Sequence, residues 1–191
     1  MNILAARTAD FLVTCGAIKQ RDISIYRYGL EVLYLSMLEV LSILLLAVWI
    51  GNFFETLLYF AAFIPLRLFA GGYHANTRLE CYFVSLGVYG VFSVVVAFAT
   101  ISYLESVLLA MVALAIIWKY APVVHINHKI SQKDLFSARS ISRSFALIEL
   151  IVVMVAGFFS EQISYVIALG LLFTAVSILS VIFSRKTIKG K

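Results

Sequence analysis

The sequence predicts an all-α, polytopic integral membrane protein, on the strength of its composition, its six long apolar segments and the placement of its basic residues. Apolar residues make up 63% of the 191 residues, and charged residues only 13%. A soluble domain of this length has an apolar fraction nearer one half. So few charged side chains cannot cover a surface that faces water. The composition therefore excludes a soluble domain.

The six apolar segments are each close to the length of a membrane-spanning helix, which needs about 20 residues within a range of about 17–25. Very short connections at the sequences GN, ES and SEQ predict tight helical hairpins. The predicted spans are residues 30–50, 52–70, 82–103, 105–123, 144–160 and 162–184.

All 15 Lys and Arg residues fall on one side of these predicted spans. They lie in the N-terminal arm, in the connections after the second and fourth spans, and in the tail. The positive-inside rule then predicts that both termini and the segment 67–81 lie on the cytoplasmic side of the membrane. A net charge of +5 with this distribution needs no nucleic-acid partner to explain it.

We expect a single membrane domain over residues 1–191, in which residues 1–29 form a cytoplasmic interfacial arm. A bundle of six helices over 30–184 includes the loop 67–81, and a basic tail covers 185–191. The arm lacks the basic start and long apolar core of a secretory signal, so we expect it to be retained. Its apolar stripe predicts an amphipathic helix on the inner leaflet, which serves either as a topology anchor or as a substrate-docking element. The stripe consists of Ile3, Leu4, Phe11, Leu12, Cys15 and Ile18.

The two cysteines face the reducing cytoplasm in this topology, so a structural disulfide is not expected. Cys15 belongs to the apolar stripe and is expected to be a buried, inert thiol. Cys81 has a different neighbourhood, because His74 precedes it by seven residues. In one continuous helix the two would lie about 10.5 Å apart along the axis. A histidine base has to come within about 3 Å of its thiol, so the chain is expected to bend between them.

The residues around Cys81 supply the means for such a bend. Gly71 and Gly72 give the backbone the necessary freedom just before His74. The sequence TRLE then predicts a capping box, with Thr77 at the N-cap and Glu80 at the third helical position. Cys81 would lie in the opening turns of this helix, where the positive end of the helix and His74 both favour the thiolate. Taken alone, these residues indicate acyl transfer. A purely structural explanation is also open, because glycines often cap helices and arginine is common at a bilayer border.

The pattern from Arg67 to Ser85, R-x-x-x-G-G-Y-H-A-x-x-x-x-x-C-x-x-x-S, resembles the signature of the accessory gene regulator B family (AgrB). The sequences YGLE before the first span and KYAPV after the fourth extend the similarity along nearly the whole chain. One departure is NHKI at residues 127–130, where the family has an Asn-Lys-Pro type of sequence.

The resemblance implies a membrane cysteine endopeptidase that processes a quorum-sensing propeptide of the AgrD type and forms a thiolactone or lactone ring. It implies Cys81 as nucleophile and His74 as base, with Arg67 and Gly72 also needed for processing. Arg67 would stabilise an oxyanion or hold an acidic part of the substrate. Asn76, Glu80 and Ser85 are candidates for supporting roles. No cofactor is implied, and a homodimer is expected from the family.

Other polar residues have both a structural and a functional interpretation. Glu39 and Glu149 lie within predicted spans and are expected to face the bundle interior. Each could form a hydrogen bond between helices, or it could pair with Arg67 or line a substrate path.

Pro65 is expected to kink or end the second span. His125 and His128 have a spacing that could share a helical face, but a metal site needs three or four ligands, so none is predicted. The basic loop 128–143 is expected to contact the anionic leaflet or an acidic part of a propeptide.

Two other classes of protein fit part of the sequence. A small transporter or exporter would account for the six spans and the intramembrane acids, but it leaves the His–Cys segment unexplained and lacks a pair of broken helices in matching halves. A non-catalytic membrane scaffold would leave the same segment without a role.

Overall fold

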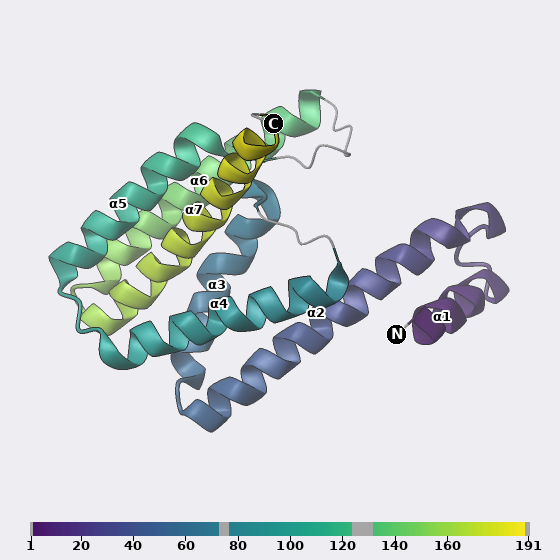
Figure 1. The fold of residues 1–191 in the computed structure, drawn as a ribbon, viewed down its shortest axis with the longest axis horizontal. Helices are drawn as coiled ribbons and strands as arrows, with labels where there is room; N and C mark the ends of the chain where they lie inside the picture. Colours follow the sequence, from purple (N-terminus) through teal and green to yellow (C-terminus); the bar gives the residue numbers. More distant parts are fainter. Residues whose placement is uncertain (1, 73–76, 124–131, 190–191) are drawn as a thin grey trace. The chain divides into compact units, whose positions relative to one another are not determined.

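The computed structural model describes residues 2–72, 77–123 and 132–189, which fold into seven α-helices and one short 3-10 helix (Figure 1). Apart from an isolated bridge between Gly71 and Val123, these residues form no β-structure. The prediction of an all-α fold is therefore confirmed. The elements are α1 (Asn2–Thr14), η1 (Gln20–Asp22), α2 (Ile23–Ile50), α3 (Phe53–Ala70), α4 (Arg78–Phe98), α5 (Tyr103–Tyr120), α6 (Gln132–Ala156) and α7 (Glu161–Lys189).

Within the described part of the chain, five helices are long and apolar enough to cross a membrane. They correspond to α2, α3, α4, α5 and α7. The fifth predicted span falls in α6, which is not among them. Arg143 lies inside α6, and the helix ends at Ala156, so its apolar part is shorter than the about 20 residues that a span needs. The count of six spans and the orientation of the termini stay predictions.

Helix α2 begins at Ile23, and the extent of the cytoplasmic arm, residues 1–29, stays a prediction. Two other predicted boundaries were wrong. The connection placed at ES lies inside α5, because Ser102 caps that helix and its backbone N–H donates to Glu105 Oε2 over 2.8 Å. This is a capping box that the sequence displays as S-x-x-E. The basic loop 128–143 is helical from Gln132 onward.

Two compact units make up the described chain, one formed by residues 1–51 and 75–91 and the other by residues 52–74 and 92–191. In the first unit, α1 packs on α2 through Ala5 and Ala9, both completely buried, and Thr8 shares a 2.9 Å hydrogen bond with Tyr34. The predicted N-terminal helix is thus present, and its large apolar side chains Ile3, Leu4 and Phe11 are exposed. Cys15 is also exposed, so the prediction of a buried thiol was wrong. It follows the last turn of α1 and lies beyond the alanines that contact α2.

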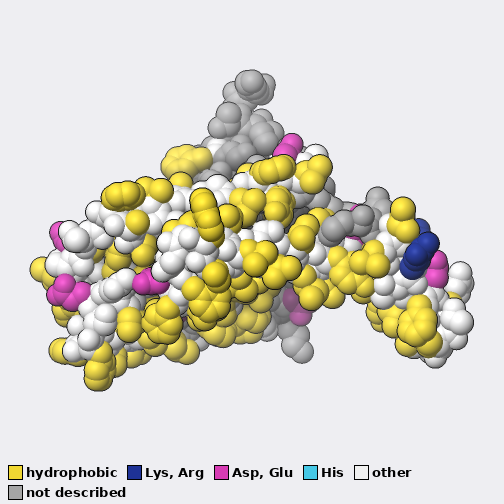
Figure 2. Space-filling model, turned by 90° about the horizontal axis from the view of Figure 1, so that it is seen from below, with side chains coloured by type: hydrophobic (Ala, Val, Ile, Leu, Met, Phe, Trp, Pro, Cys, Tyr) yellow, Lys and Arg dark blue, Asp and Glu magenta, His cyan; other side chains and the backbone are white. Residues whose placement is uncertain are grey.

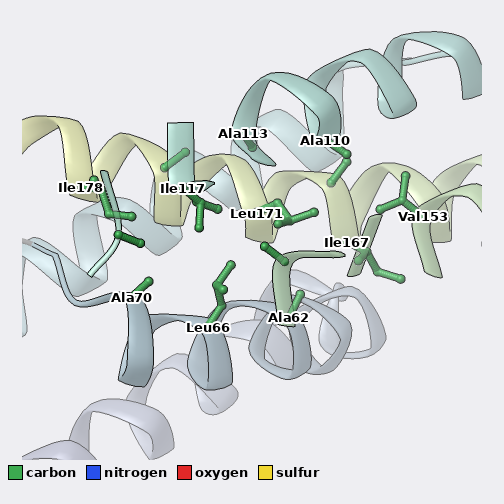
Figure 3. Packing of buried hydrophobic residues seen from close by; sticks show 14 residues of the cluster. Ala62, Leu66, Ala70, Ala110, Ala113, Ile117, Val153, Ile167, Leu171 and Ile178 are labelled. Atoms are coloured by element: carbon green, nitrogen blue, oxygen red, sulfur yellow. The ribbon is translucent and has the colours of Figure 1, made fainter. Parts of the chain in front are cut away.

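The second unit is built around α7, which packs against α3, α5 and α6 (Figure 1). Every residue of α7 from 164 to 171 is buried. Figure 3 shows Ala62, Leu66 and Ala70 of α3 opposite Ile167, Leu171 and Ile178 of α7. Alanine and glycine let these helices approach closely: a Cβ on Gly170 would lie 2.7 Å from the Cβ of Ala62. Small residues at the interface are the usual way in which membrane helices pack.

Helix α3 continues through Pro65 to Ala70, so of the two predicted effects of Pro65 it does not end the span, and a kink stays a prediction. The helix therefore carries Arg67 in its last turn. Gly51, with a φ of 87°, closes α2 and confirms the short connection at GN.

Large apolar side chains are exposed along most of the helices, and they predominate on the face drawn in Figure 2. Trp49, Phe98 and Phe159 are each at least 84% exposed. A soluble protein seldom exposes so many large apolar groups. The surface is that of a protein surrounded by lipid tails.

The first testable prediction concerns topology. Reporters fused near Asn52, Glu105 and Glu161 are expected outside the cell, because all basic residues then stay in the cytoplasm. Reporters near Lys133 and the C-terminus are expected inside. Paired alkaline phosphatase and green fluorescent protein fusions measure this. A cytoplasmic signal at Glu161 would mean that α6 does not cross the membrane.

Candidate functional site

The glycine pair at the end of α3 adopts backbone conformations that other residues rarely take. Gly71 has a φ of 74° and Gly72 a φ of 144°, both in the region that favours glycine. The N–H of Gly71 still donates to the Arg67 carbonyl over 3.2 Å, so the helix closes at this point. Helix α3 thus ends before the glycine pair and a new helix begins at Arg78, while the bend that would bring His74 to Cys81 stays a prediction.

The segment after α5 is bound to this turn. The N–H of Val123 donates to the Ala70 carbonyl over 2.9 Å, and Gly71 forms a parallel bridge with Val123. A Cβ on Gly71 would collide with the Val123 carbonyl oxygen. The structure thus places the end of the KYAPV sequence against the glycine pair. The sequence alone gave no sign of this contact, because some 50 residues separate the two segments.

Arg67 and Gly72, both predicted site residues, are in contact with each other. A Cβ on Gly72 would overlap the Nη1 atom of Arg67 and would lie 2.7 Å from its Cζ atom. The same position lies 2.6 Å from the Oγ atom of Ser177 on α7. The half-buried Arg67 guanidinium therefore occupies space that only glycine leaves open at residue 72. Ser177 is a neighbour of the site that the sequence analysis missed.

The start of α4 has the predicted capping box. The Thr77 N–H donates to Glu80 Oε2 over 3.1 Å, and the Glu80 N–H donates to Thr77 Oγ1 over 3.2 Å. The Cys81 N–H donates to the Thr77 carbonyl over 3.1 Å, so Cys81 lies in the first turn of the helix. Its side chain is half-buried. The N–H groups of a helix start carry a partial positive charge, and Cys81 lies at this end of α4.

A chain of hydrogen bonds attaches this turn to α2 within the same unit. Tyr82, the residue after Cys81, donates its hydroxyl to Ser42 Oγ over 2.9 Å. Ser42 in turn donates to the Leu38 carbonyl over 2.8 Å. A hydroxyl pair between apolar helices fixes how the helices are rotated.

The other predicted site residues are placed as follows. Glu80 is exposed and occupied by the capping box, and Ser85 lies half-buried one turn after Cys81. Cys81 and Ser85 belong to the first unit, and Arg67 and Gly72 to the second. His74 and Asn76 lie outside the described residues, so the proposed pairing of His74 with Cys81 stays a prediction.

Glu149 of α6 and Glu39 of α2 are acids that lie within predicted spans. Glu149 is 7% exposed and faces the interior of the second unit, as expected, and its Oε2 atom has no hydrogen-bond partner within the described part of the chain. Glu39 is half-buried on α2. His125 and His128 lie outside the described residues, among which no group of three or more His, Cys, Asp or Glu side chains could hold a metal ion.

The basic residue Arg143 of α6 has a structural role. It donates to the Trp118 carbonyl of α5 over 2.8 Å, and its guanidinium carbon lies 4.7 Å from the centre of the Trp118 ring. Cation–π contacts of this kind join two elements in addition to the hydrogen bond. Part of the predicted basic surface is thus used to hold α5 and α6 together.

Comparison with known proteins gives a consistent assignment. The family model described as "Accessory gene regulator B" matches residues 5–178. Protein FsrB of Enterococcus faecalis is 28% identical over 81% of this chain and 64% of its own, so the chain spans less than two thirds of that relative. Accessory gene regulator protein B of Staphylococcus epidermidis is 25% identical over 85% of this chain and 82% of its own. The protein of that name from Staphylococcus aureus is 25% identical over 84% of each chain. No solved structure matches.

The second prediction tests the packing at Gly72. Gly72→Ala is expected to lower the unfolding temperature in detergent by several degrees, since its Cβ would displace the Arg67 side chain and strain the backbone. Gly87→Ala is the matched control, because a Cβ on Gly87 meets no atom within 4 Å. That control is expected to leave the unfolding temperature unchanged or to raise it. Equal melting temperatures for Gly72→Ala and the wild type would contradict the described contact.

Proposed function

The chain belongs to the accessory gene regulator B family, and from this premise we propose that it is a membrane cysteine endopeptidase that processes a quorum-sensing propeptide of the AgrD type. The observation that carries the proposal is Cys81, in the first turn of a capped helix, at the nucleophile position of the family motif. We propose that the protein works in the bacterial cell membrane, with its site at the cytoplasmic border, and that it forms homodimers.

The reaction begins with attack of the Cys81 thiolate on a carbonyl carbon of the propeptide. A carbon–sulfur bond forms, and the peptide C–N bond breaks when the tetrahedral intermediate collapses. His74 takes the thiol proton and gives it to the departing amine. The products of this step are the released C-terminal fragment and an acyl-enzyme thioester on Cys81.

The second step closes a ring. A Cys thiol or Ser hydroxyl within the bound propeptide attacks the thioester carbonyl, the bond to Cys81 breaks, and the thiol of Cys81 regains its proton. The product is a cyclic thiolactone or lactone, the autoinducing peptide. Exclusion of water from a site at the membrane border favours ring closure over hydrolysis.

Arg67 supplies positive charge in this scheme. Its guanidinium stabilises the developing oxyanion or binds an acidic segment of the propeptide, both of which suit a planar group with several N–H donors. Gly72 is needed because any larger residue would occupy the space of that guanidinium. This assigns the two residues one shared role in place of two separate ones.

The third prediction divides the roles of the two cysteines. Cys81→Ala is expected to abolish cleavage of a co-expressed propeptide while the protein still inserts into the membrane, because the nucleophile is lost. Cys15→Ala is expected to keep full processing, since its exposed thiol lies at the end of α1. Mass spectrometry of the products measures both. Equal losses in the two variants would refute this assignment.

The fourth prediction concerns activation of Cys81. His74→Ala is expected to slow cleavage about 10²- to 10⁴-fold, the usual effect of losing a general base. Thr77→Ala is expected to slow it modestly, because the loss of an N-cap costs about 0.5–2 kcal/mol. Alkylation of Cys81 by iodoacetamide in nanodiscs at neutral pH tests the same point without a substrate. If His74→Ala alkylates as fast as the wild type, His74 is not the activating base.

A further inference from the structure

Ser177 of α7 is close to Arg67 and Gly72, although more than 100 residues separate it from them in the sequence. Its Oγ atom and the Cζ atom of Arg67 both lie within 2.7 Å of the position that a Cβ on Gly72 would take. The Ser177 hydroxyl and the Arg67 guanidinium therefore both lie next to Gly72, in space that a side chain at residue 72 would fill. Neither the family motif nor the spacing of residues in the sequence points to Ser177.

The backbone around Ser177 is well fixed. Ile178, the next residue, is completely buried and lies opposite Ala70 of α3 (Figure 3). One turn earlier, the Thr174 hydroxyl donates to the Gly170 carbonyl over 3.1 Å, at the level where Gly170 meets Ala62. The side chain of Ser177 therefore projects from a helix that cannot easily shift relative to α3.

Arginine needs such support if it is to act on a substrate. Its side chain has several rotatable bonds, and ordering it at the moment of reaction would cost conformational entropy. A fixed hydroxyl beside the guanidinium removes part of that cost before the substrate binds. A serine also suits this place because it is small and carries a polar hydroxyl that can lie beside the guanidinium.

We propose that Ser177 is a positioning residue, whose hydroxyl holds the Arg67 guanidinium beside Gly72 in the orientation that acts on the propeptide. The effect of Ser177 on catalysis rests on the proposed function. The position of Ser177 beside Arg67 does not depend on that function. Ser177 acts through Arg67 and does not take part in the reaction.

The experiment uses the full chain in nanodiscs with ¹⁵N-labelled arginine. The Nε–H signal of Arg67 is identified by its disappearance in Arg67→Lys. Ser177→Ala is expected to shift and broaden that signal, whereas Ser177→Thr, which keeps the hydroxyl, is expected to restore much of it. Ser180→Ala is the matched control, because the exposed Ser180 hydroxyl donates only to the Ser177 carbonyl, over 2.8 Å, and is expected to leave the signal unchanged. An unchanged Arg67 signal in folded Ser177→Ala would overturn the proposal.

Kinetics with a propeptide then test the catalytic consequence. Ser177→Ala is expected to lower kcat/KM about tenfold in the wild type, but less than about twofold in the Arg67→Lys background, because coupled residues are not additive. Equal factors in both backgrounds would overturn the proposal even if the signal shifts. If the wild type cleaves no propeptide, the proposed function fails, and the Arg67 signal still decides whether Ser177 holds the guanidinium.

Discussion

The packing of α3 against α7 is the contact on which the Arg67 part of the site depends. Lipid tails are as apolar as the side chains of a membrane helix, so helices in a bilayer gain stability from close contact more than from leaving water. Ala62 and Gly170 permit that contact at one level, and Leu66 and Ala70 continue it along α3. At the end of this interface Gly72 meets Ser177. The place of the Arg67 guanidinium is thus a result of how two helices pack.

The same packing explains why two glycines are needed in succession. Gly71 lies against the Val123 carbonyl, and Gly72 lies against Arg67 and Ser177. Each glycine therefore leaves room for a different neighbour, in addition to its positive φ. An alanine at either position would force a helix or a side chain to move. Their role goes beyond letting the chain turn, which is all that the sequence by itself indicated.

Local signals in the sequence predicted local structure well, and contacts between distant segments were not predictable. The capping box at Thr77 and Glu80 and the turn at the glycine pair depend on neighbouring residues, so a pattern of a few letters reveals them. The equivalent box at Ser102 lies within a continuous apolar stretch, so hydropathy by itself does not mark this helix start. Ser177 and Val123 lie next to the glycine pair because of tertiary packing. No pattern of neighbouring residues in the sequence predicts such a contact.

The length of α6 shows a further limit of hydropathy. The apolar residues after Arg143 predict a span. Helix α6, however, begins at Gln132 and includes the basic segment before Arg143. The Nη2 atom of Arg143 donates to the Trp118 carbonyl, and its guanidinium lies over the Trp118 ring. Positive charge in a sequence marks a membrane border only if the charged residue stays in water. Contact with a neighbouring helix can satisfy the same residue within the protein.

The electrostatics of helix ends apply to Arg67 and to Cys81 separately, each at the end of its own helix. The C-terminal end of a helix carries partial negative charge and stabilises a cation, and Arg67 lies in the last turn of α3. The N-terminal end carries partial positive charge and stabilises an anion, and Cys81 lies in the first turn of α4. Each helix end therefore adds a backbone contribution to the electrostatics of its own residue, Arg67 in α3 and Cys81 in α4. Charges that would be costly in the middle of a span are supported at these ends by the backbone itself.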